Sequence, residues 1–295
     1  MTVSGTISKA PITRRRFLIA STSAGAGLAL YGSEIERHWI EISHRDVFLP
    51  GLHPAFDGFL VAQLSDIHID DYTEPFLLRD AVRQINAMKP DAVFLTGDFV
   101  TRGLLPGILA IASVLSCGSL LNQLECPHRY AVLGNHDVLV NRAVIREALE
   151  ENAITVLDNA YVPIERAGAR FWLAGVDDPV EGFPDPEKAI PQSIRNMPRE
   201  PIVLLCHAPD YVDHLVALPE GQAVSLMLAG HTHGGQVRMP FAGPLVLPPM
   251  GRKYVEGWFR FGNLQLYVNR GLGTVGIPVR FDCPPEITLF TLRSA

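Results

Sequence analysis

Five short stretches of the chain place metal-binding residue types directly after an apolar run that is typical of a buried strand. They are Leu64-Ser65-Asp66-Ile67-His68, Thr96-Gly97-Asp98, Gly134-Asn135-His136-Asp137, Cys206-His207 and Gly230-His231-Thr232-His233. The carboxyl ends of parallel strands meet at one edge of a sheet, where α/β folds place their ligand sites. Carboxylates, imidazoles and an amide gathered there are ligands for divalent transition metals. The pattern predicts a hydrolase that uses two metal ions.

Asp98 is the candidate ligand that bridges the two metal ions. Two dications held close together repel each other, so anionic oxygen must lie between them. Asp66 and Asp98 supply two carboxylates, whereas imidazoles and the Asn135 amide are neutral. The ligand shell therefore keeps a positive charge and attracts phosphate. Thiolate ligands would indicate structural zinc, and none is evident in the pattern.

Each motif taken alone also has a structural explanation. Asp66 could cap the end of a strand, and Gly97-Asp98 is a common turn sequence. His231 and His233 occupy alternate positions of an extended segment and therefore share a face, as two ligands of one centre would. The ordered recurrence of such strand endings favours a metal site. The histidines that match no motif are expected on the surface or in the core, namely His38, His44, His53, His128 and His214.

Apolar runs with strand character and amphipathic runs with helical spacing alternate along the chain, as they do in α/β proteins. A helix is expected at 75–88, where Lys89-Pro90 ends the pattern. Further helices are expected at 104–124, 141–152 and 211–218, and a loop at 177–191. The expected strands are 39–48, 59–64, 92–96, 129–133, 155–157, 161–164, 171–176, 202–205, 224–228, 264–268 and 287–292.

The composition is that of a folded, acidic protein. The chain has 295 residues, of which 47% are hydrophobic, and this is enough apolar material for a large core. Its formal net charge is -6, and three arginines lie in an N-terminal segment that we do not expect in the folded body. The body is therefore more acidic still. This argues against a general nucleic-acid-binding protein, and no specific nucleic-acid binding is expected.

The N-terminus resembles a twin-arginine export signal. Arg14, Arg15 and Arg16 precede Phe17-Leu18 and a mildly apolar run, rich in Gly, Ala and Ser, that is short for a transmembrane span. We expect residues 1–33 to be a signal or a membrane tether, residues 34–58 a connection, and residues 59–295 the catalytic domain. The signal could be cleaved after export or retained as a membrane tether. The alternative interpretation is that the segment is not a signal but a basic N-terminus followed by a short buried helix.

Export by this route has consequences for partners and for location. The twin-arginine translocase becomes a partner, and because it carries folded substrates, metals can be loaded before export. The protein would then lie in the periplasm or at the extracytoplasmic face of the membrane. A membrane surface is a further expected partner.

The four cysteines are expected to be buried thiols. Cys117, Cys126, Cys206 and Cys283 form neither a CxxC pair nor a dense disulfide framework. A bridge between Cys117 and Cys126 stays open for an exported protein. Cys206 points to the opposite side of its strand from His207 and is expected to pack rather than to bind metal.

The five motifs, in this order, resemble the calcineurin-like metallophosphoesterase superfamily. The C-terminal part is similar to the twin-arginine-exported or membrane-associated bacterial phosphodiesterase branch of that superfamily. This similarity rests on Gly234-Gly235-Gln236-Val237-Arg238, on Asn269-Arg270-Gly271-Leu272-Gly273 and on Pro284-Pro285-Glu286-Ile287. The resemblance covers about residue 59 to the C-terminus. It implies an α/β fold of four layers, an αββα sandwich in which two mixed sheets are flanked by helices and the ligand loops share one rim.

The resemblance also implies roles for the site residues. One metal would be held by Asp66, His68, Asp98 and His233, and the other by Asp98, Asn135, His207 and His231. A hydroxide that bridges the metals would attack phosphorus, and His136 would protonate the leaving oxygen. Asp137 would orient or polarise the His136 imidazole. The metals could be Mn, Fe, Zn or Co, because imidazole and carboxylate accommodate all four.

Three classes of function follow from these residues. The first is a phosphodiesterase or pyrophosphohydrolase that acts on a lipid-linked, nucleotide or envelope phosphoester. The second is a phosphomonoesterase or protein phosphatase with the same metals. The third is a non-catalytic metal-binding scaffold, which the presence of His136 and the full ligand set disfavours.

The segment 238–254 mixes apolar with basic residues and has two interpretations. It could form a lip over the metals that contacts an acyl chain or the bilayer, with Arg252 or Lys253 meeting a phosphate. It could equally be a Pro-rich connection that packs on the sandwich.

Overall fold

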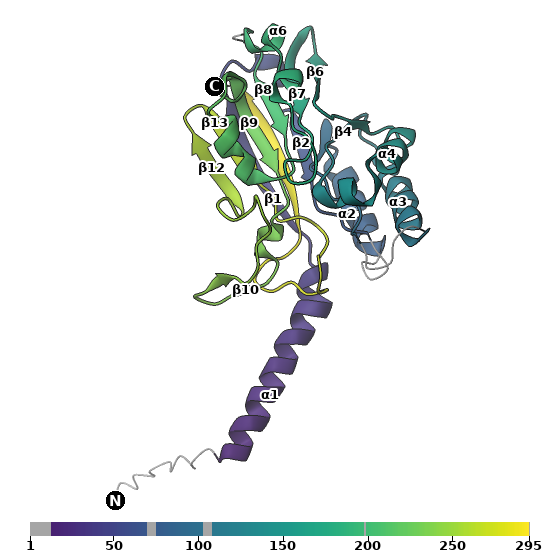
Figure 1. Ribbon diagram of the computed structural model, residues 1–295, viewed down its shortest axis with the longest axis vertical. Helices are drawn as coiled ribbons and strands as arrows, with labels where there is room; N and C mark the ends of the chain where they lie inside the picture. Colours follow the sequence, from purple (N-terminus) through teal and green to yellow (C-terminus); the bar gives the residue numbers. More distant parts are fainter. Residues whose placement is uncertain (1–12, 70–74, 103–107, 198, 295) are drawn as a thin grey trace, which may run out of the picture.

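Two six-stranded mixed sheets face each other, and helices cover their outer faces (Figure 1). The computed structural model describes residues 13–69, 75–102, 108–197 and 199–294. The predicted four-layer sandwich is confirmed. Its order of layers follows from burial, because each sheet must cover both of its apolar faces.

The strands of the first sheet lie in the order β1-β14-β2-β3-β4-β5. Only β14 and β2 run antiparallel. The three strands that end at the first motifs, β2, β3 and β4, are therefore parallel neighbours, and their carboxyl ends share an edge. The bounds are β1 (Glu41–Leu49), β14 (Glu286–Ser294), β2 (Leu60–Leu64), β3 (Ala92–Leu95), β4 (His128–Ala131) and β5 (Thr155–Val156).

The second sheet has the order β12-β13-β9-β8-β7-β6. Its central strands β13, β9, β8 and β7 are parallel, and an antiparallel strand closes each edge. A small hairpin of β10 and β11 lies outside both sheets. The bounds are β12 (Gly257–Phe261), β13 (Leu264–Val268), β9 (Val224–Ala229), β8 (Ile202–Leu205), β7 (Ala169–Gly175), β6 (Ala160–Arg166), β10 (Arg238–Met239) and β11 (Gly243–Pro244).

Aromatic and aliphatic side chains fill the space between the sheets. Phe94 and Phe290 of the first sheet and Phe171 and Leu226 of the second belong to one buried cluster. A second cluster joins the first sheet to α2 (Pro75–Met88), α3 (Ile108–Leu121) and α4 (Asn135–Glu151). A third joins the other sheet to short helices, which are α5 (Pro186–Ala189), α6 (Gln192–Arg195), α7 (Val212–Leu215) and α8 (Pro219–Ala223).

Two of the predicted helices differ from the structure. The helix expected at 141–152 begins six residues earlier, at Asn135, and is kinked at Asn141, whose φ is -177°. The helix expected at 211–218 is a 3-10 turn at Pro209–Tyr211 followed by α7. Pro219 then starts α8 instead of continuing α7, because proline fits the first turn of a helix and breaks its interior. The helix expected at 104–124 corresponds to α3, which ends at Leu121, and residues 104–107 lie outside the described residues.

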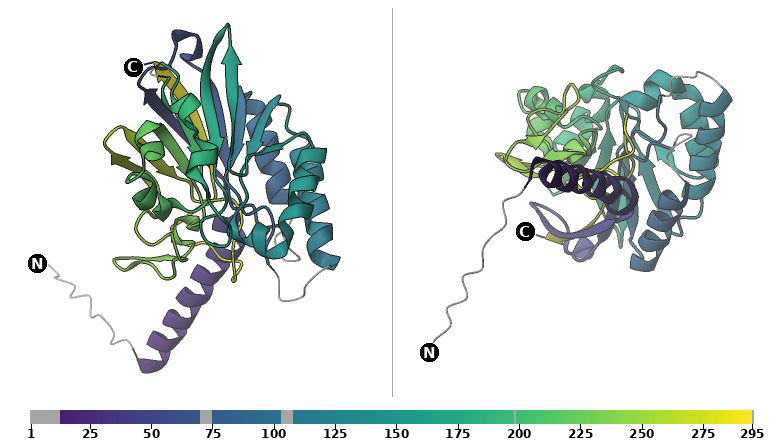
Figure 2. Two further views of the ribbon diagram at one scale, coloured as in Figure 1. Left: turned by 45° about the horizontal axis from the view of Figure 1, so that its top comes forward. Right: turned by 90° about the horizontal axis from the view of Figure 1, so that it is seen from below.

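An exposed helix, α1 (Arg14–Leu30), leads away from the two sheets (Figures 1 and 2). The turn that follows it docks on the body, where the backbone N–H of Arg280 donates to the carbonyl of Gly32 and that of Cys283 donates to the Glu36 carboxylate. The chain then enters β1, at the edge of the first sheet. Among the described residues, no helix is both long and apolar enough to cross a membrane.

Candidate metal centre

The structure brings the predicted ligands to one rim of the sandwich. Asp66 and His68 follow β2, and Asp98 follows β3. His207 follows β8 in the second sheet, and His231 and His233 follow β9. Parallel neighbours place these loops side by side, as the strand endings predict. Asn135 begins α4 and lines the same cavity as Asp98, His231 and His233.

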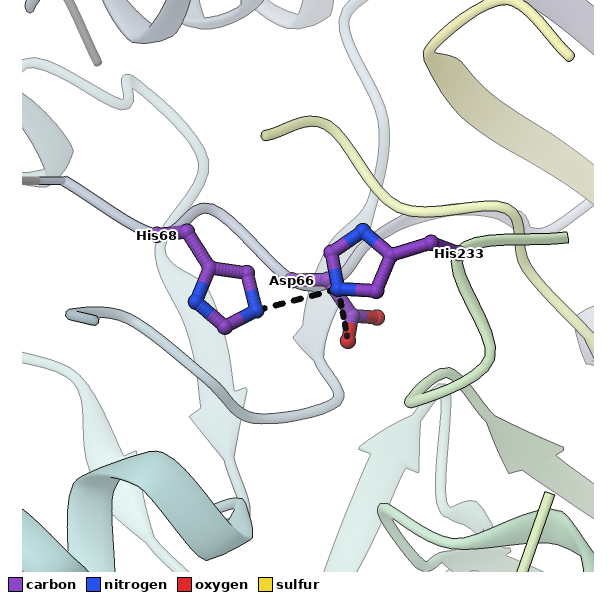
Figure 3. A group of neighbouring side chains, drawn as sticks. All are labelled: Asp66, His68 and His233. Atoms are coloured by element: carbon purple, nitrogen blue, oxygen red, sulfur yellow. Dashed lines mark hydrogen bonds and ion pairs between the residues drawn. The ribbon is translucent and has the colours of Figure 1, made fainter. Parts of the chain in front are cut away.

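Asp66, His68 and His233 form the first group of possible ligands (Figure 3). His233 Nε2 lies 3.5 Å from Asp66 Oδ1 and 3.1 Å from His68 Nε2. The Asp66 carboxylate is held in place by the backbone N–H of His231, which donates to it at 2.9 Å. All three side chains are buried.

Asp98, His207 and His231 form the second group. Asp98 Oδ2 lies 3.1 Å from His207 Nε2 and also 3.4 Å from His68 Nε2, which belongs to the first group. One carboxylate oxygen therefore touches imidazoles of both groups. The other oxygen, Oδ1, accepts the backbone N–H of His136 at 2.9 Å, and this fixes the orientation of the carboxylate.

The imidazoles are arranged so that nitrogen lone pairs face inward. His207 Nδ1 lies 2.7 Å from the carbonyl of Thr96, and His231 Nε2 lies 2.7 Å from that of Pro249. A carbonyl only accepts, so these nitrogens carry the hydrogen and the other nitrogen of each neutral ring carries a lone pair. The two inward nitrogens lie 3.2 Å apart. Backbone acceptors behind ligand histidines are typical of metal sites.

A buried amide oxygen supports the same conclusion. Asn135 Oδ1 is buried and has no hydrogen-bond partner among the described residues. Buried polar atoms without a partner are rare and mark strain or a missing ion. Inward lone pairs, two carboxylates and this oxygen form a donor set that suits two divalent transition metals.

Burial keeps most of these imidazoles neutral. It lowers the pKa of His68 and of His233 well below the usual value, and it lowers that of His231 to about 4. Burial alone would also lower the pKa of His207, but the carboxylates of Asp98, Asp66 and Asp178 together outweigh it and raise that pKa well above its ordinary value. Neutral imidazole is the form that binds metal, so a cation at His207 would displace its proton.

The ligand loops have an unusual backbone. Asp66, His68, Asp98, His231 and His233 all adopt positive φ, between 50° and 73°. Such conformations cost a non-glycine residue on the order of 1 kcal/mol and persist where the surroundings enforce them, often at functional sites. Five of the seven candidate ligands have this conformation, which sets their loops apart from ordinary turns.

His136 lies beside His68, with ring centroids 4.8 Å apart. Its Nδ1 accepts the backbone N–H of Arg102 at 3.1 Å, so the proton of the neutral ring is on Nε2. The ring lines the cavity at the metal centre. His136 is also within reach of His68 and Asp98 as a third possible ligand group.

The expected role of Asp137 is corrected by the structure. Its buried carboxylate accepts the backbone N–H groups of Asp98, Phe99 and Gly134 at 2.8 to 2.9 Å. In the described part of the chain its hydrogen bonds go to backbone, and the His136 ring is held by Arg102 instead. Successive helical residues point in different directions, so Asp137 turns back over the start of α4. It ties the Asp98 loop to the Asn135 loop.

Arg280 is a supporting residue that the sequence did not reveal. Its side chain is fully buried and donates to the carbonyls of Gly271, Gly273 and Cys283 at 2.6 to 3.1 Å. Gly271 in turn packs on Asp66, because a Cβ at Gly271 would lie 2.6 Å from the Asp66 Cβ. Nothing in the sequence distinguishes this buried arginine from an exposed one.

The remaining predictions about side chains have mixed outcomes. The four cysteines are buried, free thiols, so Cys117 and Cys126 are not bonded to each other. Lys253 pairs with Asp213, and the backbone N–H groups of Arg252 and Lys253 donate to Asp210. Neither basic residue is among the described residues that line the cavity at the metal centre, so neither is placed to meet a phosphate there.

Comparisons with known proteins agree with this geometry. A sequence model of the calcineurin-like phosphoesterase family matches residues 59–235. The uncharacterized metallophosphoesterase YkuE of Bacillus subtilis is 35% identical over 96% of this chain and 98% of its own length. The phosphodiesterase YaeI of Escherichia coli is 34% identical over 95% of this chain and 99% of its own.

A solved structure shares the fold. The NAD nucleotidase of Haemophilus influenzae superimposes with a TM-score of 0.50 and 13% sequence identity. The match covers 72% of this chain and 45% of that one. At this identity the likeness shows a common fold alone.

Proposed function

The chain belongs to the calcineurin-like phosphoesterase family, whose members are metal-dependent hydrolases, and on that premise we propose that it hydrolyses a phosphodiester or pyrophosphate bond. The observation that carries the proposal is the position of Asp98. One of its oxygens contacts His68 and His207, and so joins the two groups of ligands into one buried centre.

The ligands divide into two sets that share Asp98. The first set is Asp66, His68, Asp98 and His233, and the second is Asp98, Asn135, His207 and His231. When bound, two divalent cations supply Lewis acidity, which activates water and offsets negative charge on the phosphoryl oxygens. Mn, Fe, Zn and Co all suit the nitrogen and oxygen donors.

His136 is the proposed general acid. Its Nδ1 is occupied by the backbone N–H of Arg102, which leaves the proton on Nε2. The ring lines the cavity, where a leaving oxygen could take that proton. Asp137 contributes indirectly, since it fixes the loop that carries Asp98 and the start of the helix that carries His136.

The walls of the cavity favour a diester over a monoester. No Lys or Arg is found among the described residues that line it. A phosphomonoester is dianionic and is usually met by basic side chains, whereas a diester carries one negative charge. The named relative YaeI is a phosphodiesterase, which supports the same choice.

The test compares two chromogenic substrates on manganese-reconstituted protein. We expect kcat/KM for bis-p-nitrophenyl phosphate to exceed that for p-nitrophenyl phosphate by at least about tenfold, the equivalent of one missing charge contact. A preference for the monoester would favour the phosphomonoesterase or protein phosphatase instead. A metal-loaded protein that cleaves neither would indicate the non-catalytic scaffold.

Export by the twin-arginine translocase is part of the proposal. The support is the position of Arg14, Arg15 and Arg16 at the start of an exposed helix that stands away from the catalytic body. Residues 1–33 would then be the signal or tether, and residues 59–295 the catalytic domain at the extracytoplasmic face. Replacing Arg14 and Arg15 by lysine should retain the protein in the cytoplasm on cell fractionation; unchanged export would remove this part.

A further inference from the structure

The cavity at the metal centre is lined by polar residues of the centre and by apolar residues from two other segments. Its volume is about 500 Å³. Asp98, Asn135 and His136 are among the polar residues. The other walls come from the segment after the last ligands and from the loop after Gly273, with Val237, Leu245, Val246, Pro248, Val275 and Ile277. We propose that these walls form a subsite for an acyl or alkyl chain of the substrate, an inference that rests on the proposed function.

The two apolar walls are held at a fixed spacing by one side chain. Gln236 Nε2 donates to the carbonyls of Val275 and Ile277 at 3.1 and 3.0 Å, and Gln236 Oε1 accepts the N–H of Val275 at 2.8 Å. On the opposite wall the N–H of Leu245 donates to the carbonyl of Val237 at 3.1 Å. The cavity is therefore preformed, as binding pockets usually are.

The polar side chains in these walls, Gln236 and Thr232, have their hydrogen-bond donors engaged within the protein. The Gln236 amide is used by the backbone of Val275 and Ile277. Thr232 Oγ1 donates to the carbonyl of Val255 at 2.6 Å and accepts the N–H of Gly234 at 3.1 Å. A nucleoside base in this part of the cavity would lose hydrogen bonds to water, and neither Gln236 nor Thr232 has a free donor to replace them. An acyl chain makes no hydrogen bonds to water and therefore loses none on entering the cavity.

The mouth of the cavity is apolar and open to water. The exposed fractions are 60% for Leu245, 79% for Val246 and 58% for Ile277, and Phe241 at the tip of the nearby hairpin is fully exposed. Adjoining exposed apolar side chains mark surfaces that bind an apolar partner. An acyl chain that entered the cavity past these residues would cover their apolar side chains and remove them from water.

The exposed helix leaves the body close to this mouth. The loop that carries Ile277 leads directly into Arg280, whose backbone N–H donates to the carbonyl of Gly32 in the turn after α1. The hairpin of β10 and β11 and helix α1 extend from the same end of the two sheets (Figures 1 and 2). A lipid surface near α1 would therefore lie near the entrance of the subsite.

The first test varies the length of the chain on a small phosphodiester. We expect kcat/KM of the manganese-loaded protein to be at least about tenfold higher for hexyl than for methyl p-nitrophenyl phosphate, since each buried methylene is worth up to about fourfold. In Leu245→Asp, and in Ile277→Asp as a second variant, the ratio of the two esters should fall towards one. Leu115→Asp is the matched control, because Leu115 is 58% exposed on α3 and lies outside the cavity lining.

The second test measures binding without turnover. The fluorescent fatty acid cis-parinaric acid should bind the wild type and Leu115→Asp with equal affinity, and Leu245→Asp at least about tenfold more weakly. Equal kcat/KM for both esters in the wild type would overturn the subsite and leave the proposed function standing. If neither ester were cleaved, the proposed function would fall, and equal binding of the fatty acid by all three proteins would then remove the subsite as well.

Discussion

His136 is the residue on which two explanations of the centre differ most. Its Nε2 could carry the proton for the leaving oxygen, or it could bind a metal together with His68 and Asp98. Both roles require the same position of the ring. Only the role as proton donor leaves the metal content unchanged when the His136 side chain is removed.

We predict that His136→Ala keeps both metals and slows turnover by about 10²- to 10⁴-fold on an ester with a poor leaving group, which is the usual contribution of a positioned acid. The loss should be much smaller for a p-nitrophenyl ester, whose leaving oxygen needs no proton. Elemental analysis and kcat on both esters are the measurements. His44→Ala, at an exposed position of β1, is the control. Loss of a metal from His136→Ala would show that this residue is a ligand.

Single residues also show what the sequence could and could not predict. The ligand types were readable because Asp66, Asp98 and His207 each follow a short apolar run that is typical of a buried strand. The direction of the Asp137 carboxylate was not readable, since it depends on three backbone N–H groups from two loops. Arg280 was missed because burial of an arginine is decided by its distant carbonyl partners.

At the scale of elements, α4 joins two helical segments with different tasks. The first turn presents Asn135 and His136 to the centre, and the longer part packs Ile145 and Leu149 against the first sheet. Asn141 separates them. Its Oδ1 accepts the N–H groups of Ala143 and Val144 at 3.1 and 3.3 Å, so it caps the second segment as a helix-initiating residue does.

We predict that Asn141→Ala lowers the free energy of unfolding by about 1 kcal/mol, because the two N–H groups lose their acceptor. Asn141→Asp should retain most of the stability, since a carboxylate at a helix start accepts the same hydrogen bonds. Urea unfolding of the three proteins measures the difference. An equal loss in both variants would contradict the capping role.

The same residue explains why the start of α4 was predicted too late. The sequence indicates a helix start at Asn141 because the second helical segment of α4 does begin there. The extra turn from Asn135 is stabilised by tertiary contacts, since Asp137 accepts the N–H of Gly134 and of two residues after β3. Local propensity carries no information on such contacts. The positive φ of the ligand residues was unpredictable for the same reason.

At the scale of the whole molecule, the sandwich makes one site from two sheets. β2 and β3 supply Asp66, His68 and Asp98, and β8 and β9 supply the remaining imidazoles. Neither sheet alone holds a complete ligand set. Alternation of strands and helices predicted an α/β fold, and the resemblance to the family implied its four layers. The pairing of β14 between β1 and β2 joins segments that are more than two hundred residues apart and could not be inferred from local patterns.

The arrangement also relates the N-terminal helix to the catalytic rim. The turn after α1 contacts Arg280 through Gly32, and Arg280 supports the Gly271 and Gly273 loop beside Asp66. The hairpin of β10 and β11, which precedes Leu245 and Val246 of the cavity lining, lies at the same end of the molecule as α1 (Figure 1). An exported protein held at a membrane by this helix would present its cavity towards lipid.

The central claim is that Asp98 joins two metal ions in one centre, and metal counting tests it most directly. We expect inductively coupled plasma mass spectrometry to find two divalent metals per chain in the manganese-reconstituted wild type and in His44→Ala. Asp98→Asn should hold one at most, because it lacks the anionic oxygen between the cations. A wild type that binds a single metal, or a folded Asp98→Asn that still binds two, would contradict the account.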